Sequence, residues 1–372
     1  MKLTNLSANG FRNLSSGELS FSDGVNVICG ENAQGKTNLI EAIWMFTGNA
    51  SFRGSKPSQM IAFDKKTASV SIQFEDSVRI QDAFISIGEK KEMRLNGVPI
   101  SSSSEFCGHF YAVVFSPAHL SLVQEGPVYR RRFLDIAISQ IRPQYGAYLS
   151  RYEKLIDQRN ALLKQPYGDD ILRTYLSVWD EQISKIGTIL TSYRNDYITK
   201  LSRIAAQVYD GLSGQKEPFA VSYDSTVFSH PSDVTSYEER HIEAYQKALE
   251  ESFLTDRKQG FTSVGPHRDD LSFTLSDRSA RLYGSQGQQR SCVIALKLAE
   301  AKLLKKAVGE SPVLLLDDVM SELDPSRQHY ILHHVRDLQV FITCCDEASV
   351  EERFGGTVFF MKDGALTQKT EE

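Results

Sequence analysis

The fold of this chain is decided by residues 30–37, which read Gly30-Glu31-Asn32-Ala33-Gln34-Gly35-Lys36-Thr37. This stretch fits the pattern G-x-x-x-x-G-K-[ST], follows the apolar segment 25–29 and opens a run with helical spacing. A strand, a glycine-rich turn and a helix N-terminus in that order form a phosphate-binding loop, because backbone N–H groups and the positive end of the helix face the phosphates. The sequence therefore predicts an α/β nucleotide-binding domain.

Each position of this loop has an expected task. Lys36 reaches the β- and γ-phosphates of ATP, and the hydroxyl of Thr37 ligates Mg²⁺. The predicted nucleotide-binding residues of the loop are Gly30, Glu31, Asn32, Ala33, Gln34, Gly35, Lys36, Thr37 and Asn38.

The second half of the site lies near the other end of the chain, where Leu314-Leu315-Leu316 is followed by Asp317-Asp318. A buried strand delivers such carboxylates to its carboxyl-terminal edge, where α/β proteins bind ligands. Asp317 suits Mg²⁺, and Asp318 suits polarisation of the attacking water. We therefore predict that Lys36, Asp317 and Asp318 are catalytic and that Thr37 and Asp317 hold the metal.

The pattern of apolar residues and turns between these two halves predicts that the nucleotide-binding domain is discontinuous in the sequence. Short apolar segments and turns, including Asn96-Gly97, indicate a strand-rich lobe over the first hundred residues. Apolar residues that recur three and four positions apart then indicate two helices, which are joined by a turn at 165–169. We predict a discontinuous α/β nucleotide-binding head from residues 1–120 and 261–372, and an inserted α-helical arm over 121–260. A compact helical subdomain, rather than a projecting antiparallel hairpin, is the alternative for the insertion.

Composition limits the function classes. The net charge is −5 and the sequence pI is near 6.0, so the chain lacks the global basic field of an obligate nucleic-acid binder. Five cysteines, an odd number without paired metal spacing, argue against a disulfide framework or a zinc site. The sequence contains no apolar run long enough to suggest a membrane span. We expect a soluble cytoplasmic protein in which any contact with DNA would use a local patch.

Such a patch is predicted over residues 125–165, which contain eight basic and four acidic residues. Two copies of it in a dimer would line a groove for phosphates. The alternative is an ordinary solvated helix face. The candidate DNA-contacting residues are Arg130, Arg131, Arg132, Arg142 and Arg151.

Further motifs carry a family resemblance. Residues 284–290, Gly-Ser-Gln-Gly-Gln-Gln-Arg, resemble the signature motif of ABC-type ATPases, and Ser321-Glu322-Leu323-Asp324 resembles their D-loop. Loop, signature, Asp-Asp strand and D-loop occur in the order found in the SMC superfamily. The segments 9–14, 115–117, 130–135 and 265–270, together with 30–42, are similar to those of the RecF family, over nearly the whole chain.

This resemblance implies that the head is an ABC-type ATPase head, and that ATP drives a homodimer in which Ser285 of one subunit caps ATP bound by Lys36 of the other. It places Arg12, Gly287, Gln288 and Asp324 near the nucleotide. It also implies binding to DNA near single-strand/duplex junctions, and cooperation with RecR and RecO in loading RecA during recombinational repair and replication restart. An SMC-type ATPase with another DNA or partner role is the alternative, ahead of a transporter subunit or a helicase-type motor.

Two departures from the ABC pattern predict slow hydrolysis. Asp318 stands where glutamate is usual, and Thr343-Cys344-Cys345 follows the last strand where many members have a histidine. We therefore expect a slow, DNA-stimulated ATPase that acts as a switch. His267 invites a catalytic interpretation, but a single histidine after Gly-Pro without ligand spacing is more typical of a structural anchor.

Overall fold

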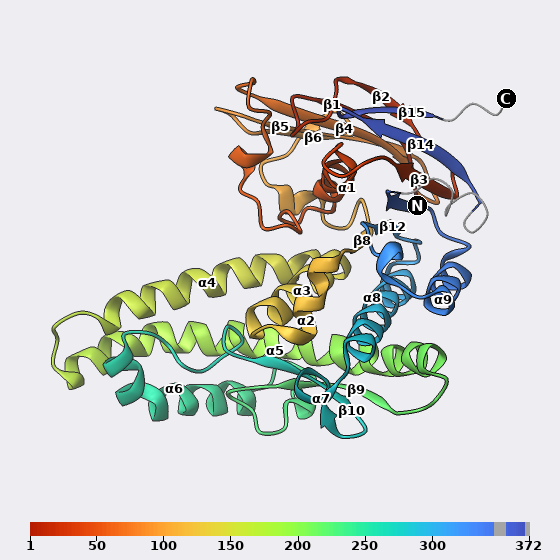
Figure 1. Cartoon of the computed structure of the whole chain (residues 1–372). Helices are drawn as coiled ribbons and strands as arrows, with labels where there is room; N and C mark the ends of the chain where they lie inside the picture. The colour runs from red at the N-terminus through yellow and green to blue at the C-terminus, as the bar shows by residue number, and fades with distance from the viewer. Residues whose placement is uncertain (346–354, 369–372) are drawn as a thin grey trace. The chain divides into compact units, whose positions relative to one another are not determined.

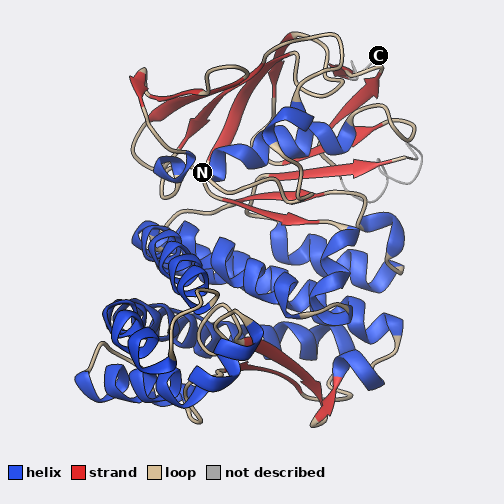
Figure 2. Ribbon diagram, turned by 90° about the vertical axis from the view of Figure 1, so that its left-hand side faces the viewer, coloured by secondary structure: helices blue, strands red, loops and turns tan. Residues whose placement is uncertain are grey.

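The computed structural model describes residues 1–345 and 355–368. Their contacts divide the chain into two compact units, Met1–Leu120 with Val293–Glu372, and Ser121–Cys292. The first unit holds most of the strands and the second is mainly helical (Figures 1 and 2).

The first unit contains an antiparallel sheet with the strand order β2-β1-β4-β5-β6-β7. Buried and exposed positions alternate along β4, as expected for a strand with one face on the core. The predicted turn at Asn96-Gly97 is confirmed, because both residues have the positive φ values, 52° and 75°, of a two-residue hairpin. The strands are β1 Lys2–Asn9, β2 Gly17–Ser20, β4 Ala68–Glu75, β5 Ile80–Ile87, β6 Glu92–Leu95 and β7 Val98–Pro99.

The second sheet of this unit has the order β15-β14-β3-β13-β12-β8. Its five strands from β14 to β8 are parallel, and β15 pairs antiparallel with β14. The central strands are apolar along their length, as a parallel sheet covered on both faces requires. The strands are β3 Val25–Cys29, β8 Ala112–Phe115, β12 Val313–Leu316, β13 Val340–Cys344, β14 Thr357–Lys362 and β15 Ala365–Gln368.

This topology places β3 next to β13, and β13 next to β12. The carboxyl ends of β3 and β12 therefore meet at one edge, although the two strands lie far apart in the sequence. The helices of the unit are α1 Lys36–Trp44, α9 Pro325–Val335 and the later part of α8 Gln286–Val308. Short 3-10 turns complete it at η1 Met45–Thr47, η2 Pro57–Met60, η3 Ser103–Phe106, η4 Pro117–Leu120 and η6 Met320–Glu322.

The second unit is built on α5 Asp169–Ser213, a helix of 45 residues and about 67 Å. The helix α4 Pro143–Leu163 packs against it as the other arm of an antiparallel hairpin, and α6 Glu239–Gln259 packs on α5 as well. The hairpin is thus part of a compact unit. The remaining helices are α2 Ser121–Gln124, α3 Pro127–Ile141, α7 Ala280–Tyr283 and the turn η5 Pro231–Asp233.

A small sheet completes the second unit, with the order β11-β10-β9. Its strands are β9 Phe219–Asp224, β10 Asp270–Leu275 and β11 Arg278–Ser279. Because β10 pairs with β9 along its whole length, residues 261–292 belong to the second unit rather than to the head, where we placed them from the sequence. The strand β9 alternates buried Phe219, Val221 and Tyr223 with exposed positions, but this local pattern does not identify β10 as its partner.

Candidate functional site

The predicted phosphate loop joins β3 to α1 in the first unit. Gly35 is the N-cap of α1 and has φ 119°, and Ala33 has φ 66°. A Cβ atom on Gly30 would lie 2.4 Å from the carbonyl oxygen of Met361, and one on Gly35 would lie 2.8 Å from Oδ1 of Asn13. The glycines at both ends of the loop are therefore required by the backbone conformation and by close neighbours.

Lys36 is 7% exposed and curls back over the loop. Its ammonium donates to the carbonyl oxygens of Gly30 and Glu31, and it lies 3.6 Å from Sγ of Cys345. The thiol of Cys345 also lies 3.1 Å from Oδ1 of Asn32. Cys345, which follows β13, is thus part of the loop's surroundings, in the region where ABC-type ATPases often have a histidine.

The two halves of the predicted site meet at Asp317. The hydroxyl of Thr37 donates to Oδ1 of Asp317 at 2.9 Å, and the hydroxyl of Thr343 donates to the same oxygen at 3.1 Å. Burial raises the pKa of Asp317, against the opposing effect of these two hydrogen bonds. The Thr37 hydroxyl and the buried carboxylate of Asp317 therefore lie next to each other. Oxygen atoms of these two kinds are ligands that Mg²⁺ prefers.

Asp318, the second carboxylate, adopts a left-handed conformation with φ 54°. Its backbone N–H donates to Thr343 Oγ1 at 2.8 Å, and its Oδ1 accepts a hydrogen bond from Ser321 at 2.9 Å. A non-glycine residue is held in this region only where its surroundings fix it, which is common at functional sites. Asp324, in the segment that resembles a D-loop, is instead the N-cap of α9 and accepts from the N–H of Arg327.

Arg12 is committed to an ion pair inside the first unit. Its guanidinium makes two hydrogen bonds to the fully buried Glu41 of α1, at 3.0 and 3.1 Å. It also donates to Ser55 and to the carbonyl oxygen of Gln59. Arg12 therefore braces α1, the helix that starts at the phosphate loop.

Arg53 is a residue that the sequence analysis missed. It donates to Oδ1 of Asn38, in the first turn of α1, at 2.9 Å and lies 3.7 Å from Glu41. Its positive charge is close enough to lower the pKa of Asp317, although burial has the larger, opposite effect. The side chain remains 42% exposed. Arg53 lies in the loop between η1 and η2, where an arginine has no distinctive spacing, so no local pattern identifies it.

The signature-like segment lies in the second unit, at the start of α8. Ser285 and Gln288 cap this helix reciprocally, because the N–H of Ser285 donates to Gln288 Oε1 at 2.7 Å and the N–H of Gln288 lies 3.3 Å from Ser285 Oγ. The amide of Gln288 also donates to both carboxylate oxygens of Glu217 at 2.8 Å. Gly287 occupies the first turn between them.

His267 is a structural residue of the second unit. Its Nδ1 lies 2.8 Å from the hydroxyl of Tyr152, and its Nε2 lies 3.0 Å from the carbonyl oxygen of Thr262. Burial lowers its pKa to about 4. Gly265, with φ 123°, passes so close to Tyr152 and Tyr245 that a Cβ there would meet their hydroxyls at 2.3 and 2.1 Å. The segment 265–270 therefore anchors β10 onto the helices α4 and α6.

The arginines proposed to contact DNA differ in how far their side chains are exposed. Arg130 is 5% exposed and pairs with Asp270 through two hydrogen bonds, so it is removed from the DNA-contact set. Arg131, half-buried, donates to the carbonyl oxygen of Asp269 at 2.9 Å, and Arg132 is half-buried as well. Arg142 and Arg151 are exposed. The charge count over 125–165 also included Arg159, which is fully buried.

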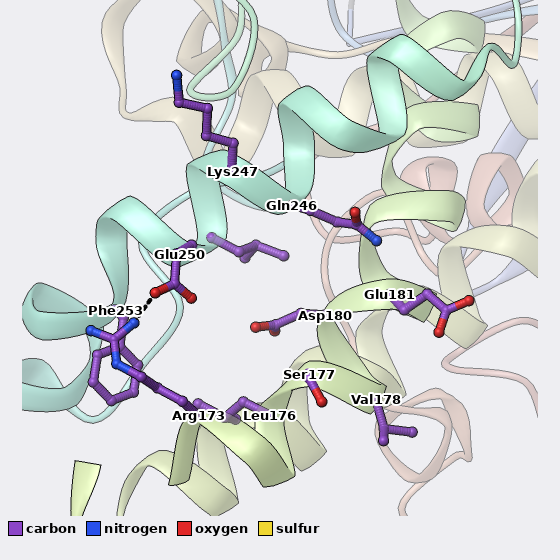
Figure 3. Close-up of a pocket in the computed structure, with 11 residues that line it drawn as sticks. Arg173, Leu176, Ser177, Val178, Asp180, Glu181, Gln246, Lys247, Glu250 and Phe253 are labelled. Carbon is purple, nitrogen blue, oxygen red and sulfur yellow. Dashed lines mark hydrogen bonds and ion pairs between the residues drawn. The ribbon is translucent and has the colours of Figure 1, made fainter. Parts of the chain in front are cut away.

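A groove of about 540 Å³ lies between α5 and α6 in the second unit (Figure 3). The apolar residues Leu176, Leu249 and Phe253 are among those that line it. Arg173 pairs with Glu250, and its guanidinium carbon lies 3.9 Å from the centroid of the Phe253 ring. This groove is built from other residues than those predicted to bind nucleotide, and we assign it no part in nucleotide chemistry.

Within residues 1–345 and 355–368, none of the helices combines the length and apolar character needed to span a bilayer. In that same part of the chain, no cluster of three or more His, Cys, Asp and Glu side chains forms a ready metal cage. The Thr37–Asp317 pair is a smaller donor set, of the kind that Mg²⁺ completes with waters and phosphate oxygens.

Comparison with known proteins gives full-length matches. A family model described as the RecF/RecN/SMC N terminal domain matches residues 2–365. The DNA replication and repair protein RecF of Ruminiclostridium cellulolyticum is 38% identical over 358 residues, which cover 95% of this chain and 94% of that protein. Two solved structures of the recombination mediator protein RecF in the RecFOR pathway, with ATPrS and with ATP, match with TM-scores of 0.91 and 0.90. Both are 35% identical and cover 99% of this chain and 98% of theirs.

Proposed function

Because this chain belongs to the RecF family of DNA replication and repair proteins, we propose that it is an ATP-driven DNA clamp of recombinational repair. The observation that carries this proposal is the 2.9 Å hydrogen bond between Thr37 and Asp317, which joins the two sequence halves of an ABC-type site. The comparable structure of a RecF protein with ATP supports ATP as the nucleotide.

The residues of the first unit divide the work on ATP. The amides of the phosphate loop and Lys36 hold the phosphates, and Thr37 and Asp317 would hold Mg²⁺. The metal, when bound, neutralises charge on the phosphate oxygens. Asp318 orients the attacking water and accepts its proton. Arg53, beside the first turn of α1, is suited to contact the phosphates as a further cation.

The site is completed by a second copy of the chain. Ser285, at the start of α8, offers a hydroxyl and the helix N-terminus to a phosphate. We propose that it caps ATP on the partner subunit, so that ATP binding drives dimerisation and hydrolysis releases it. The short carboxylate of Asp318 and the thiol of Cys345 in place of a histidine make hydrolysis slow, as a timed clamp requires.

DNA binding is assigned to the exposed basic side chains of the second unit, with Arg142 and Arg151 as the first candidates. The preferred DNA is a single-strand/duplex junction or gap. We also propose cooperation with RecR and RecO in loading RecA, which is supported by the place of the matching RecF structures in the RecFOR pathway.

Sedimentation velocity with and without Mg-ATP and gapped DNA tests this proposal. We expect a monomer without ATP, a dimer with ATP and retention of that dimer on DNA. A Lys36→Arg variant should keep part of its ATP binding and lose hydrolysis, because arginine keeps the charge but not the geometry. A sedimentation coefficient that is unchanged by ATP and DNA would contradict the proposal, and turnover of many ATP per second would contradict the slow clamp.

A further inference from the structure

The phosphate loop is contacted from outside by a hairpin that comes from the C-terminal end of the chain. The strands β14 and β15 are joined by Asp363 and Gly364, and both have positive φ values, 50° and 78°. These values and the two-residue length define a tight hairpin turn. The N–H of Gly364 donates to the carbonyl oxygen of Gln34 at 2.9 Å, and the N–H of Asp363 donates to Gln34 Oε1 at 2.5 Å.

A second contact comes from Asn13. Its side-chain amide donates to the carbonyl oxygen of Ala33 at 3.3 Å, and its Oδ1 accepts from Asn38 Nδ2 at 2.7 Å. The hairpin turn holds this segment in turn, because the N–H of Ser15 donates to the carbonyl oxygen of Gly364 at 2.9 Å. Turn, segment 13–15 and phosphate loop are therefore one hydrogen-bonded assembly.

These contacts fix the direction of two peptide groups. In a trans peptide the C=O and the following N–H point in opposite directions. With the carbonyl of Ala33 held by Asn13, the N–H of Gln34 is turned away from Asn13. With the carbonyl of Gln34 held by Gly364, the N–H of Gly35 is turned away from the hairpin. The loop's amides are the groups that bind phosphate oxygens.

We propose that the Asp363–Gly364 turn and Asn13 are positioning elements of the nucleotide site, which aim the amides of Gln34 and Gly35 at the phosphates of ATP. This inference rests on the proposed ATP binding and adds residues outside the loop to it. A larger residue than glycine at position 364 would displace its neighbours, since a Cβ there would lie 1.7 Å from the carbonyl oxygen of Asn13.

The chain supplies a matched control for the turn. Gly97 closes another two-residue hairpin, β6–β7, with φ 75°, and a Cβ there would meet nothing within 4 Å. Gly364→Ala and Gly97→Ala therefore introduce the same left-handed strain, but only the first pushes against Asn13. Any difference between the two variants in ATP binding reports the contact with the loop.

The experiment measures the dissociation constant of Mg-ATP by calorimetry, and the Tm without nucleotide, for the wild type and the variants Gly364→Ala, Gly97→Ala and Asn13→Ala. We expect Gly364→Ala to weaken ATP binding at least about tenfold, because misdirected amides lose phosphate contacts. Its Tm should fall below that of Gly97→Ala, because its Cβ also displaces the backbone of Asn13. Asn13→Ala, which introduces no backbone strain, should weaken binding in the same direction.

Three outcomes decide the matter. If Gly364→Ala and Asn13→Ala bind ATP as tightly as the wild type and Gly97→Ala, the positioning role is wrong. If Gly364→Ala does not fold, the dissociation constant of Asn13→Ala alone decides. If the wild type and Gly97→Ala also fail to bind ATP, the proposed function fails rather than the inference about the turn.

Discussion

The buried His267 should make the stability of the second unit depend on pH, by an amount that follows from its lowered pKa. A carbonyl oxygen only accepts hydrogen bonds, so Nε2 carries the proton toward Thr262 and Nδ1 accepts from the Tyr152 hydroxyl. Burial lowers the pKa of His267 to about 4, whereas an unfolded histidine titrates near about 6.5. Between these values the unfolded chain binds the proton and the folded chain does not.

The folded state therefore loses stability as the pH falls through this window, and keeps all of it above about pH 6.5. The full effect of the pKa difference is about 3 kcal/mol, and about 2 kcal/mol of it is lost by pH 5 relative to pH 8. His267→Gln cannot titrate, so its stability should fall by about 2 kcal/mol less over the same interval.

Urea denaturation at pH 8 and pH 5 measures this difference. Trp44 and Trp179 are the two tryptophans of the chain, and a Trp44→Phe background leaves Trp179 of α5 to report on the second unit. His230→Gln is the matched control, because His230 is an exposed histidine of the same unit. If His267→Gln and His230→Gln lose stability equally on acidification, the buried neutral histidine is refuted.

Three further predictions concern the other sites. Arg12→Ala leaves the buried carboxylate of Glu41 without its main partner and should destabilise the first unit by about 3 kcal/mol; a melting curve unchanged from the wild type would contradict the pairing. Asp317→Asn should weaken Mg-ATP binding at least about tenfold without lowering nucleotide-free stability, since burial disfavours the charged form. Because the pKa of Asp317 is raised, the wild type should gain stability relative to this variant as the pH falls. Thermal melts that show the opposite trend would contradict the raised pKa of Asp317. Arg142→Glu with Arg151→Glu should weaken DNA binding and reduce the slope of log affinity against log salt by about 2, whereas Arg130→Ala should act on stability through Asp270; equal salt slopes would exclude these side chains from the DNA interface.

Local patterns were sufficient for the elements whose signals are local. The strand before the phosphate loop, the strand before Asp317 and the Asn96-Gly97 hairpin lie where periodicity and turn chemistry put them. Family resemblance added the ABC-type order of motifs. These features are fixed by short-range backbone preferences and by the burial of apolar runs, so a single sequence reveals them.

Long-range pairings were not predictable in the same way. The pairing of β9 with β10 moved residues 261–292 into the second unit, and the β14–β15 hairpin beside the phosphate loop had no expected role. The charge count over 125–165 could not show that Arg130 and Arg159 pair inside the unit, because their carboxylate partners come from distant segments. Arg53 was missed because its partner Asn38 lies across a loop.

The central claim is that one subunit's Lys36 and the other's Ser285 share an ATP, and mixing two defective variants tests it directly. Lys36→Ala cannot hold ATP but keeps Ser285, and Ser285→Arg keeps the phosphate loop but cannot cap a partner's ATP. Each alone should sediment as a monomer with Mg-ATP. An equimolar mixture can form one intact site per pair, so we predict that it yields an ATP-dependent dimer. A mixture that remains monomeric, or a Ser285→Arg protein that dimerises alone, would contradict the account.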